Sequence, residues 1–257
     1  YQKAIHKNIF YIEKEADGVA VEIALQYADD ISSRIFPFAN NIYTAEGGTH
    51  MTGFRTALTR SLNTYARKGN AVKDSEENFT GDDVIEGLTA VVSVKLPEIQ
   101  FEGQTKGKLG SVEARGAVEK VFSEAMAEFL EENPDDGKAI ISKSILALKA
   151  RKAAKAAEAA IMRGDAIGPL HGVPIAMKDC FDFKPGWVTT FGGVRALKNY
   201  VAKTYCMFAE RMEQAGAILV GKTNSPVFGF RGTCDNYLFG PSKNPFDLSR
   251  NTGGSSG

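Results

Sequence analysis

Alternation of apolar and polar residues predicts β-strands near the N-terminus of the chain. The longest alternating stretch is Val19–Tyr27. Its apolar members, which would face a core, are Val21, Ile23, Leu25 and Tyr27. A shorter strand, Ile9–Ile12, precedes it, and the dipeptide Asp17-Gly18 between the two is typical of a tight hairpin turn. Arg34–Ala39 is a further apolar run of strand length, so a sheet with a buried face is expected.

Apolar residues at helical spacing come next, and they predict a helix from Thr49 to about Arg67. Its apolar face contains Phe54, Leu58, Leu62 and Tyr65. Thr49 is the expected N-cap, because its hydroxyl can accept a hydrogen bond from the first turn. A second helix is expected from Ser111, since the apolar residues between Val118 and Leu130 form one wide face.

A short helix, Asp82–Gly87, is expected to lead into the strand Leu88–Leu96. That strand does not alternate, and its apolar run predicts burial on both faces. Strands and helices in this order indicate a mixed α/β domain.

The stretch Lys138–Arg163 predicts one long helix, because alanine, lysine and arginine dominate it. Pro134 lies just ahead, where a helix start tolerates proline, and Gly164 stands where a helix would end. Basic residues gather near the end of this helix: Lys149, Arg151, Lys152 and Lys155. They could approach DNA or form an ordinary solvated face, and the residues alone favour the solvated face.

Beyond this helix the predicted elements are short. Ile175–Met177 and Ala217–Val220 are expected to be buried strands, and Tyr205–Ala215 is expected to be a helix. Glycine, proline, serine and asparagine crowd Thr223–Gly257, which indicates turns and loops.

Composition places the chain among ordinary globular proteins, with 257 residues, 43% of them hydrophobic and 24% charged. The 31 basic and 31 acidic residues balance, so the net charge does not demand a nucleic-acid partner. The three cysteines show no CxxC spacing and predict free thiols in the cytoplasm, and the histidines form no metal-binding pattern. No apolar run is long enough to span a membrane. Tyr1 stands in place of an initiator methionine, so the chain is expected to be a fragment at its N-terminus.

In the N-terminal half of the chain, the best candidate for a ligand-binding site is the loop Gln104–Lys108. A flexible loop of glycine and lysine can reach a phosphate, where Lys106 would act as a point charge. Solvated surface loops have the same composition, and the residues alone favour that simpler interpretation.

The stretch Gly216–Thr223 satisfies the phosphate-loop pattern G-x-x-x-x-G-K-[ST]. Such a loop must follow a strand, so that its backbone N–H groups are free to bind phosphate. Here the predicted strand lies inside the pattern, and Pro226 opposes the helix that should come next. We therefore expect no nucleotide site at Lys222.

Lys178 is the stronger candidate, because it ends a short apolar run. Burial favours the neutral amine of a lysine, which can then accept a proton as a base. The simpler alternative is an ion pair with Asp179 or Asp182 at the end of a strand. Gly253–Gly257 also has two interpretations, either a flexible tail or part of a site.

Two segments of the first part, NNIYTAEGGTHMTGFRTALTRSLNTYARK (Asn40–Lys68) and DDVIEGLTAVVSVKLPEIQFEGQTKGKLG (Asp82–Gly110), together with the helices after them, resemble the B subunit of bacterial DNA gyrase. The resemblance covers residues 1–157. It lies in the transducer domain, between the ATP-binding domain and the DNA-cleavage region, and implies a ribosomal-S5-like α/β fold.

In that family a Gln-Thr-Lys loop reaches into the ATP site of the preceding domain. The resemblance implies that Gln104 and Lys106 contact the γ-phosphate of ATP, whose Mg²⁺ belongs to the same site, and report its presence toward the DNA gate. It also implies the gyrase A subunit and DNA as partners. In that family the ATP-binding domain precedes the transducer domain, and residues 1–257 show none of its motifs, so this chain as given is expected not to hydrolyse ATP.

Three segments of the second part closely resemble the amidase signature family: GPLHGVPIAMKDCFD (168–182), AGAILVGKTNSPVFGF (215–230) and GTCDNYLFGPSKNPFDLSRNTGGSSG (232–257). Those enzymes hydrolyse carboxylic amides without a cofactor, through a Ser–Ser–Lys triad on an α/β/α fold. The resemblance implies that Lys178 is the general base and that Ser255, on a cis peptide bond, relays a proton. The nucleophile would lie in a motif beyond Gly257, so no amide cleavage by this chain is expected. Ser225–Phe228 departs from the family's usual Met-Pro-Glu-Phe.

We therefore expect a gyrase B fragment at residues 1–157, fused within the long helix to an incomplete amidase domain at residues 158–257 that would take a small amide substrate. Two alternatives stay open: an amidase with a borrowed N-terminal domain, and a non-catalytic interaction protein. The first part is expected to fold alone and the second to be less stable.

Overall fold

The computed structural model describes residues 4–73, 75–244 and 246–255. The chain divides after Lys149 into two compact units, the N-terminal unit and the C-terminal unit, and each is described by itself. Within the described ranges, no helix combines the length and the apolar character that a membrane span requires.

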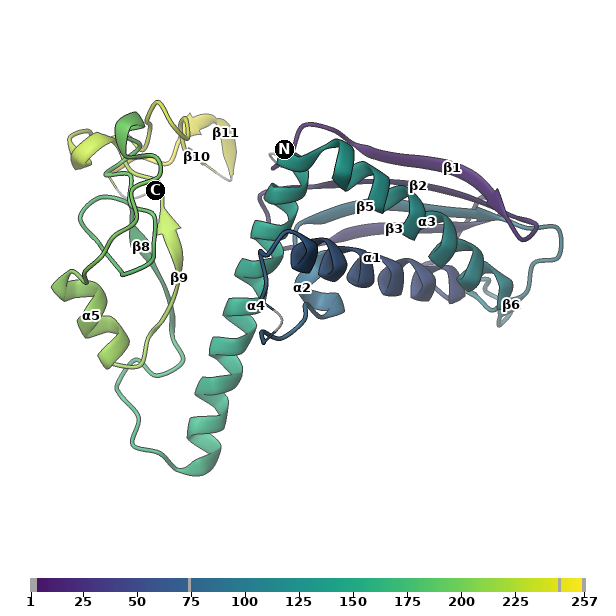
Figure 1. The fold of residues 1–257 in the computed structure, drawn as a ribbon, viewed down its shortest axis with the longest axis horizontal. Coiled ribbons are helices and arrows are strands. Elements are labelled where there is room, and N and C mark those ends of the chain that lie inside the picture. Colours follow the sequence, from purple (N-terminus) through teal and green to yellow (C-terminus); the bar gives the residue numbers. More distant parts are fainter. Residues whose placement is uncertain (1–3, 74, 245, 256–257) are drawn as a thin grey trace. The chain divides into compact units, whose positions relative to one another are not determined.

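The N-terminal unit is built on a five-stranded sheet with the strand order β1-β2-β5-β3-β4. Its strands are β1 (Phe10–Ala16), β2 (Val19–Tyr27), β3 (Arg34–Ala39), β4 (Ile42–Tyr43) and β5 (Leu88–Lys95). β3 and β5 run parallel, whereas the other neighbouring strands are antiparallel. Helices α1 (Thr49–Lys68) and α3 (Glu113–Glu132) lie side by side against one face of this sheet (Figure 1), and the short α2 (Gly81–Ile85) precedes β5.

The core of this unit lies between the sheet and the two helices. Every second residue of β2 is buried, as its alternation predicted. Phe54 of α1 and Phe122 of α3 meet edge to face with ring centroids 5.1 Å apart, and Phe10 of β1 packs on Phe122 at 5.3 Å. Each of these rings is at most 2% exposed, so burial contributes about 2 to 3 kcal/mol per side chain.

Two expectations for this unit are wrong. β5 is not buried on both faces: Val92 is 0% exposed, whereas Val91 is 40% exposed, because the helices cover only one face of the sheet. Thr49 is not the N-cap of α1; Gly48 occupies that position with a φ of 127°, and Thr49 is the first helical residue. The hydroxyl of Thr49 instead donates to the carbonyl of Ser111 at 2.6 Å.

A small antiparallel hairpin formed by β6 (Phe101–Glu102) and β7 (Lys108–Leu109) carries the glycine-rich loop. The hairpin is docked on the start of α1 through backbone contacts. The N–H of Leu109 donates to the carbonyl of Gly47 at 3.0 Å, and the N–H of Glu46 donates to the carbonyl of Gly107 at 2.9 Å. A Cβ atom on Gly48 would lie 2.3 Å from the carbonyl oxygen of Leu109, so only glycine allows this close approach.

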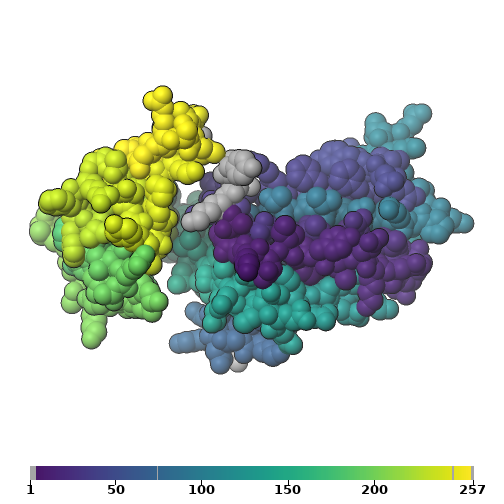
Figure 2. Space-filling view, turned by 90° about the horizontal axis from the view of Figure 1, so that it is seen from above, coloured from purple at the N-terminus to yellow at the C-terminus, as the bar shows by residue number. Residues whose placement is uncertain are grey.

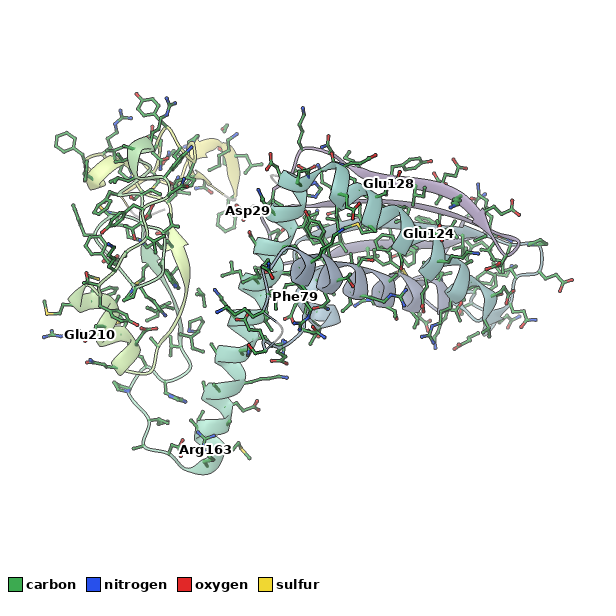
Figure 3. All side chains as sticks on the ribbon, in the orientation of Figure 1. Asp29, Phe79, Glu124, Glu128, Arg163 and Glu210 are labelled. Carbon is green, nitrogen blue, oxygen red and sulfur yellow. The ribbon has the colours of Figure 1, made fainter. Side chains whose placement is uncertain are left out.

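Helix α4 (Pro134–Arg163) connects the two units along the chain. It begins at Pro134, earlier than the alanine-rich pattern predicted, because its first turn is acidic and proline is tolerated at the first helical position. Its first half buries Ile140 and Leu148 in the core of the N-terminal unit. The helix ends at Arg163, labelled in Figure 3, and Gly164 follows with a φ of 73°.

The C-terminal unit is centred on a parallel pair of strands, β8 (Pro174–Lys178) and β9 (Ile218–Thr223). Its other elements are η1 (Arg195–Leu197), α5 (Met207–Gln214), η2 (Val227–Gly229), β10 (Lys243–Asn244) and β11 (Asp247–Asn251). A small core of Met177, Ala209 and Leu219 joins the two strands to α5. In the view of Figure 2, the yellow residues that follow β9 gather on one side of this unit and the green residues that precede it on the other.

Candidate functional site

Lys178 lies at the C-terminal end of β8, opposite Thr223 of β9. Its backbone N–H donates to a carboxylate oxygen of Asp182 at 3.1 Å. Its side chain has a different partner: the ammonium Nζ donates to Oγ of Ser255 at 2.6 Å. Both residues are half-buried, and the contact joins positions 77 residues apart in the sequence.

Ser255 is held by the loop 232–234. The peptide bond between Gly254 and Ser255 is cis. A Cβ atom on Gly254 would lie 2.8 Å from the backbone of Thr233, so the glycine allows the two backbones to touch. The N–H of Cys234 donates to the carbonyl of Gly253 at 3.0 Å, which fixes the segment just before the serine. The structure therefore brings Lys178 and Ser255 together through backbone contacts that the sequence does not reveal.

Gly229 and two cysteines lie around Lys178. A Cβ atom on Gly229 would lie 3.6 Å from Nζ of Lys178 and 3.5 Å from Sγ of Cys180, so this glycine forms a wall of the site. Burial raises the pKa of the Cys180 thiol and that of the Cys234 thiol. Both thiols are therefore protonated at neutral pH and are poor nucleophiles. The three cysteines are free.

The alternative in which Asp179 pairs with the side chain of Lys178 does not match the structure. Its carboxylate accepts from Nζ of Lys222 at 3.1 Å, and not from the side chain of Lys178. The same carboxylate accepts from the backbone N–H of Thr190 at 3.0 Å and from the Thr190 hydroxyl. The sequence held one indication of this ion pair. Lys222, the lysine of the apparent phosphate loop, lies in β9, which pairs with β8 just before Asp179.

The placement of Lys222 also argues against a phosphate loop. Lys222 is a strand residue of β9, and its ammonium donates to Asp179 and, at 2.6 Å, to the hydroxyl of Thr189. The Lys222 ammonium is committed to these two partners. The strand residues inside the motif pair with β8, so their backbone N–H groups do not form a phosphate cradle. The prediction that a strand lies inside this motif is confirmed.

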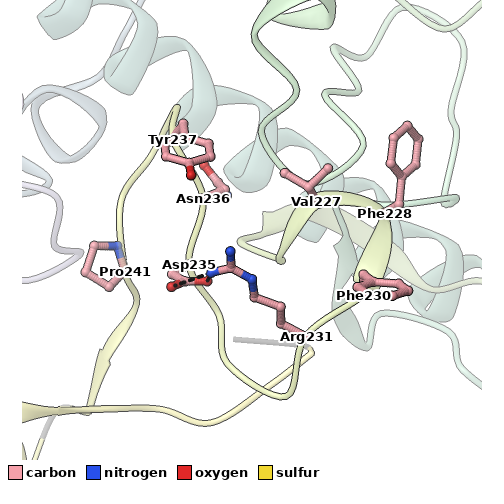
Figure 4. Close-up of a pocket in the computed structure, with 8 residues that line it drawn as sticks. All are labelled: Val227, Phe228, Phe230, Arg231, Asp235, Asn236, Tyr237 and Pro241. Carbon is pink, nitrogen blue, oxygen red and sulfur yellow. Dashed lines mark hydrogen bonds and ion pairs between the residues drawn. The ribbon is translucent and has the colours of Figure 1, made fainter.

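A pocket of about 590 Å³ opens on the loop that follows β9. Its lining residues, drawn in Figure 4, are Val227, Phe228, Phe230, Arg231, Asp235, Asn236, Tyr237 and Pro241. Arg231 and Asp235 form an ion pair of 3.3 Å across it. Neither Lys178 nor Ser255 lines this pocket, but Phe228 and Phe230 of its lining flank Gly229, the glycine beside Lys178.

Gln104 and Lys106 lie at the exposed tip of the β6–β7 hairpin in the N-terminal unit. Lys106 has a φ of 55°, in the left-handed region that a tight turn requires. Below the tip, Lys108 pairs with Glu102 across the hairpin at 2.7 Å. The docked base of the hairpin therefore presents Gln104 and Lys106 to solvent from a defined position. No group of three or more metal-ligating side chains that could hold an ion occurs among the described residues.

Comparison with protein families gives two matches. The family model described as DNA gyrase B matches residues 1–160, and the one described as Amidase matches residues 138–257. The two matches overlap within α4. They agree with a fusion of the two families in one chain.

The B subunit of DNA gyrase from Bacillus mycoides is 49% identical over 184 residues, which are 72% of this chain and 45% of that protein. Its counterpart in Haloferax lucentense is 51% identical over 178 residues, 69% of this chain and 28% of that protein. This chain thus spans less than half the length of these curated relatives.

Two solved structures are each similar to a part of the chain. The 43K ATPase domain of Thermus thermophilus gyrase B in complex with an aminocoumarin has a TM-score of 0.57 and 43% identity, covering 61% of this chain and 42% of that chain. A bacterial aryl acylamidase of the amidase signature family has a TM-score of 0.41 and 49% identity, covering 43% of this chain and 23% of that chain.

Proposed function

The chain belongs, through residues 1–160, to the DNA gyrase B family, and from this premise we propose that this part is the transducer domain of a gyrase B protein. It has a ribosomal-S5-like fold and couples ATP binding and hydrolysis to the DNA gate. The observation that carries the proposal is the exposed pair Gln104 and Lys106 on a hairpin docked to α1. The boundary with the second functional part lies within α4, at residues 157 and 158.

Lys106 and Gln104 contact the γ-phosphate of ATP in this proposal. The exposed Lys106 ammonium neutralises phosphate charge, and the Gln104 amide donates a hydrogen bond to it. ATP and its Mg²⁺ supply the phosphoryl chemistry when bound. Loss of the phosphate releases the hairpin, whose base is joined to α1 through Gly47 and Leu109. Gyrase A and DNA are the proposed partners of the complete assembly.

A graft tests this function. Residues 1–149 replace the matching segment of Bacillus mycoides gyrase B, and ATP hydrolysis and DNA supercoiling are measured with gyrase A present. Lys106→Ala is expected to lower the ATP turnover number roughly 100-fold, the effect of removing one charge-stabilising donor. Lys108→Ala is the matched control on the same hairpin, since Lys108 pairs with Glu102. Equal rates for the two variants would contradict the proposed role.

The C-terminal part is proposed as an amidase domain that hydrolyses small carboxylic amides. The observation that favours this second function is the 2.6 Å contact between Lys178 and Ser255. When the lysine amine is neutral, its nitrogen accepts the hydroxyl proton of Ser255, and that serine in turn accepts a proton from a nucleophilic hydroxyl. Lys178 is the general base and Ser255 the relay. By the resemblance, the nucleophile belongs to a later glycine-rich motif.

A segment exchange tests the amidase proposal. Residues 165–257 replace the matching segment of the bacterial aryl acylamidase. Hydrolysis of an anilide substrate is followed by absorbance. Lys178→Ala and Ser255→Ala are each expected to lower the turnover number by roughly three orders of magnitude, as loss of one member of a triad does. Cys180→Ala, a neighbour of the site with no proton-transfer role, serves as the control. Activity retained in Lys178→Ala would rule the assignment out.

A further inference from the structure

We propose that the N-terminal unit binds an amphipathic helix of a partner protein, one with a basic flank, on the sheet face turned away from α1 and α3. Those two helices contact β1, β2 and β5 from the other side of the sheet (Figure 1). Among the described residues of this unit, no helix covers the second face, which we call the open face. The proposal goes beyond both proposed functions and depends on neither.

An apolar stripe crosses the open face at right angles to the strands. Register pairing places Tyr11 of β1 opposite Ala24 of β2. The same pairing places Ala24 opposite Val91 of β5, and Val91 opposite Phe36 of β3. Tyr11 is 56% exposed, Phe36 42% and Val91 40%. Neighbouring strands lie about 5 Å apart, so the four side chains form a continuous row about 14 Å long.

Two aromatic residues widen the stripe at its β3 end. Phe38 lies two residues after Phe36 on the same face of β3, and its ring lies 5.6 Å from that of Tyr43 in β4, measured between centroids. Tyr43 is 51% exposed. A solvated face of an antiparallel sheet normally carries polar residues. A contiguous row of exposed apolar side chains on such a face therefore indicates a surface that binds another protein.

Carboxylates line one side of the stripe. Glu13 of β1 and Glu22 of β2 are register partners in the row next to it, and Glu15 lies one row further along β1. The hydroxyl of Tyr11 donates to Glu13 at 3.2 Å and to Glu22 at 3.3 Å, so both carboxylates adjoin the end of the stripe. Among the described residues, none of the three carboxylates forms an ion pair. Their negative charge is available to a basic partner.

The other side of the stripe carries no acidic residue in the row next to it. Gln26 of β2 pairs with Thr89 of β5, and Thr89 pairs with Arg34 of β3. Lys95 lies on the acidic side, but two rows from the stripe. The charge of the open face is thus negative on one side of the stripe and positive on the other. A partner with lysine or arginine on one flank and neutral or acidic residues on the other matches both sides.

A helix fits the length of this stripe. Residues i, i+4, i+7 and i+11 lie on one face of a helix and span about 16 Å. Such apolar residues are the usual anchors of a helix bound to an apolar surface. With the anchors on the stripe, basic residues on one flank of the helix lie over Glu13 and Glu22. The opposite orientation would place those basic residues over Arg34, so the charges select one direction.

Designed peptides test the proposal on the complete 257-residue chain. The probe is a fluorescently labelled helical peptide of about 15 residues, with leucine at i, i+4, i+7 and i+11 and lysine along one flank. A second peptide has glutamate in place of those lysines. Fluorescence anisotropy measures both dissociation constants. We expect the lysine peptide to bind about 10-fold more tightly at low ionic strength, and we expect high salt to reduce this preference.

Two substitutions separate the charge of the open face from its apolar stripe. The double variant Glu13→Lys, Glu22→Lys is expected to reverse the preference, so that the glutamate peptide binds about 10-fold more tightly than the lysine peptide. Val91→Lys is expected to weaken both peptides by about 10-fold or more, because it places a charge in the middle of the stripe. Val91 is 40% exposed, so the longer side chain can reach solvent without disturbing the core.

Glu128→Lys is the matched control. Glu128, labelled in Figure 3, is exposed on α3, which contacts the other face of the sheet. Its replacement is expected to leave both dissociation constants unchanged, and circular dichroism checks that every variant is folded. If the double lysine variant does not fold, Glu13→Gln, Glu22→Gln still decides, because it should abolish the preference between the peptides.

Three results would overturn the proposal. The first is the absence of binding of the lysine peptide. The second is equal binding of the two peptides, since a merely apolar surface does not distinguish the charge of a flank. The third is dimerisation of the unaltered chain that Val91→Lys abolishes, measured by analytical ultracentrifugation, because the open face would then bind a second copy of this chain.

Discussion

At the scale of single residues, buried polar groups hold the N-terminal unit together at defined points. Asp136, in the first turn of α4, accepts from the backbone N–H groups of Asn8 at 3.0 Å and of Lys7 at 3.3 Å. His6 is buried beside it and accepts from the N–H of Tyr27 at 2.9 Å. One carboxylate thus fastens the segment before β1 to the start of the connecting helix.

Substitution of Asp136 should therefore be costly. Asp136→Ala leaves two backbone N–H groups without their acceptor, and we expect it to lower the free energy of unfolding of the N-terminal unit by about 2 kcal/mol. Urea denaturation followed by circular dichroism measures this change. Asp135→Ala is the matched control, since its side chain is 97% exposed and it makes only a long ion pair. Equal losses for the two variants would contradict the role of Asp136.

His50 makes the stability of the N-terminal unit depend on pH. The residue is 0% exposed, its Nδ1 has no partner among the described residues, and burial lowers its pKa from 6.5 to about 4. The unfolded chain therefore binds a proton at a higher pH than the folded unit does. The contribution of His50 is fully present above pH 6.5 and is lost as the pH falls toward 4.

Between pH 6.5 and 5, this difference in proton binding should lower the free energy of unfolding by about 2 kcal/mol. Chemical denaturation at both pH values measures it in the unaltered chain and in His50→Gln. The variant is expected to lose most of this pH dependence, although burial lowers the pKa of His6 as well and leaves a smaller slope. If the free energy of unfolding depended on pH equally in His50→Gln and in the unaltered chain, groups other than His50 would cause that dependence.

At the scale of elements, the position of a hairpin depends on a single glycine. β6 and β7 hold the Gln104–Lys106 tip, and they are joined to the start of α1 through the backbone of Gly47 and the close approach at Gly48. These contacts are made by backbone atoms, and the hairpin adds the side chain of Leu109, which is 0% exposed in the core, and that of Phe101, which packs against the core. The backbone part of this docking cannot be deduced from the alternation and composition of residues 101–109.

Gly48→Ala is expected to release the hairpin. The added Cβ would lie 2.3 Å from the carbonyl oxygen of Leu109, and the φ of 127° is strained for any L side chain. Hydrogen exchange should show loss of protection at the amide of Leu109, with an overall loss of stability of about 2 to 3 kcal/mol. Gly116→Ala in α3 is the control, because nothing lies within 4 Å of its Cβ position and alanine favours a helix. If the amide of Leu109 stayed protected from exchange in Gly48→Ala, Gly48 would not be required for docking of the hairpin on α1.

At the scale of the whole molecule, the two units differ in the size of their cores. The N-terminal unit buries large side chains of its sheet and of α1, α3 and α4 in one cluster, and the C-terminal unit has a cluster centred on Met177, Ala209 and Leu219. Large apolar side chains lie exposed in the C-terminal unit, among them Phe230 at 93% and Phe246 at 97%. Burial of apolar surface is the main stabilising contribution to a fold, so the units should differ in stability.

Limited proteolysis should therefore cut the C-terminal unit first. We expect a resistant fragment that ends near Lys149, and two separate heat-absorption transitions with the C-terminal unit unfolding at the lower temperature. Mass spectrometry identifies the fragment. Early degradation of the residues before Lys149, or a single cooperative transition, would contradict this expectation.

The sequence by itself determined the identity and most of the extent of the regular elements. β2 and β3 have the predicted boundaries, and α1 extends one residue beyond the predicted end, because period-two and period-3.6 patterns depend on neighbours along the chain. The same local chemistry places the turn at Asp17 and Gly18, both of which have positive φ values. The mixed α/β class follows from the order of these elements.

Tertiary structure alone decided what those elements touch. β5 carries Val91 on the same face as its polar residues Thr89, Ser93 and Lys95, and the helices cover the opposite face, so Val92 is buried and Val91 is not. Lys178 has two aspartates close in sequence, but its ammonium bonds to Ser255, 77 residues away, and Asp179 bonds to Lys222 instead. Side-chain pairing depends on which strands adjoin and which faces they share. A pattern along one chain does not contain that information, because distant segments meet only after the chain has folded.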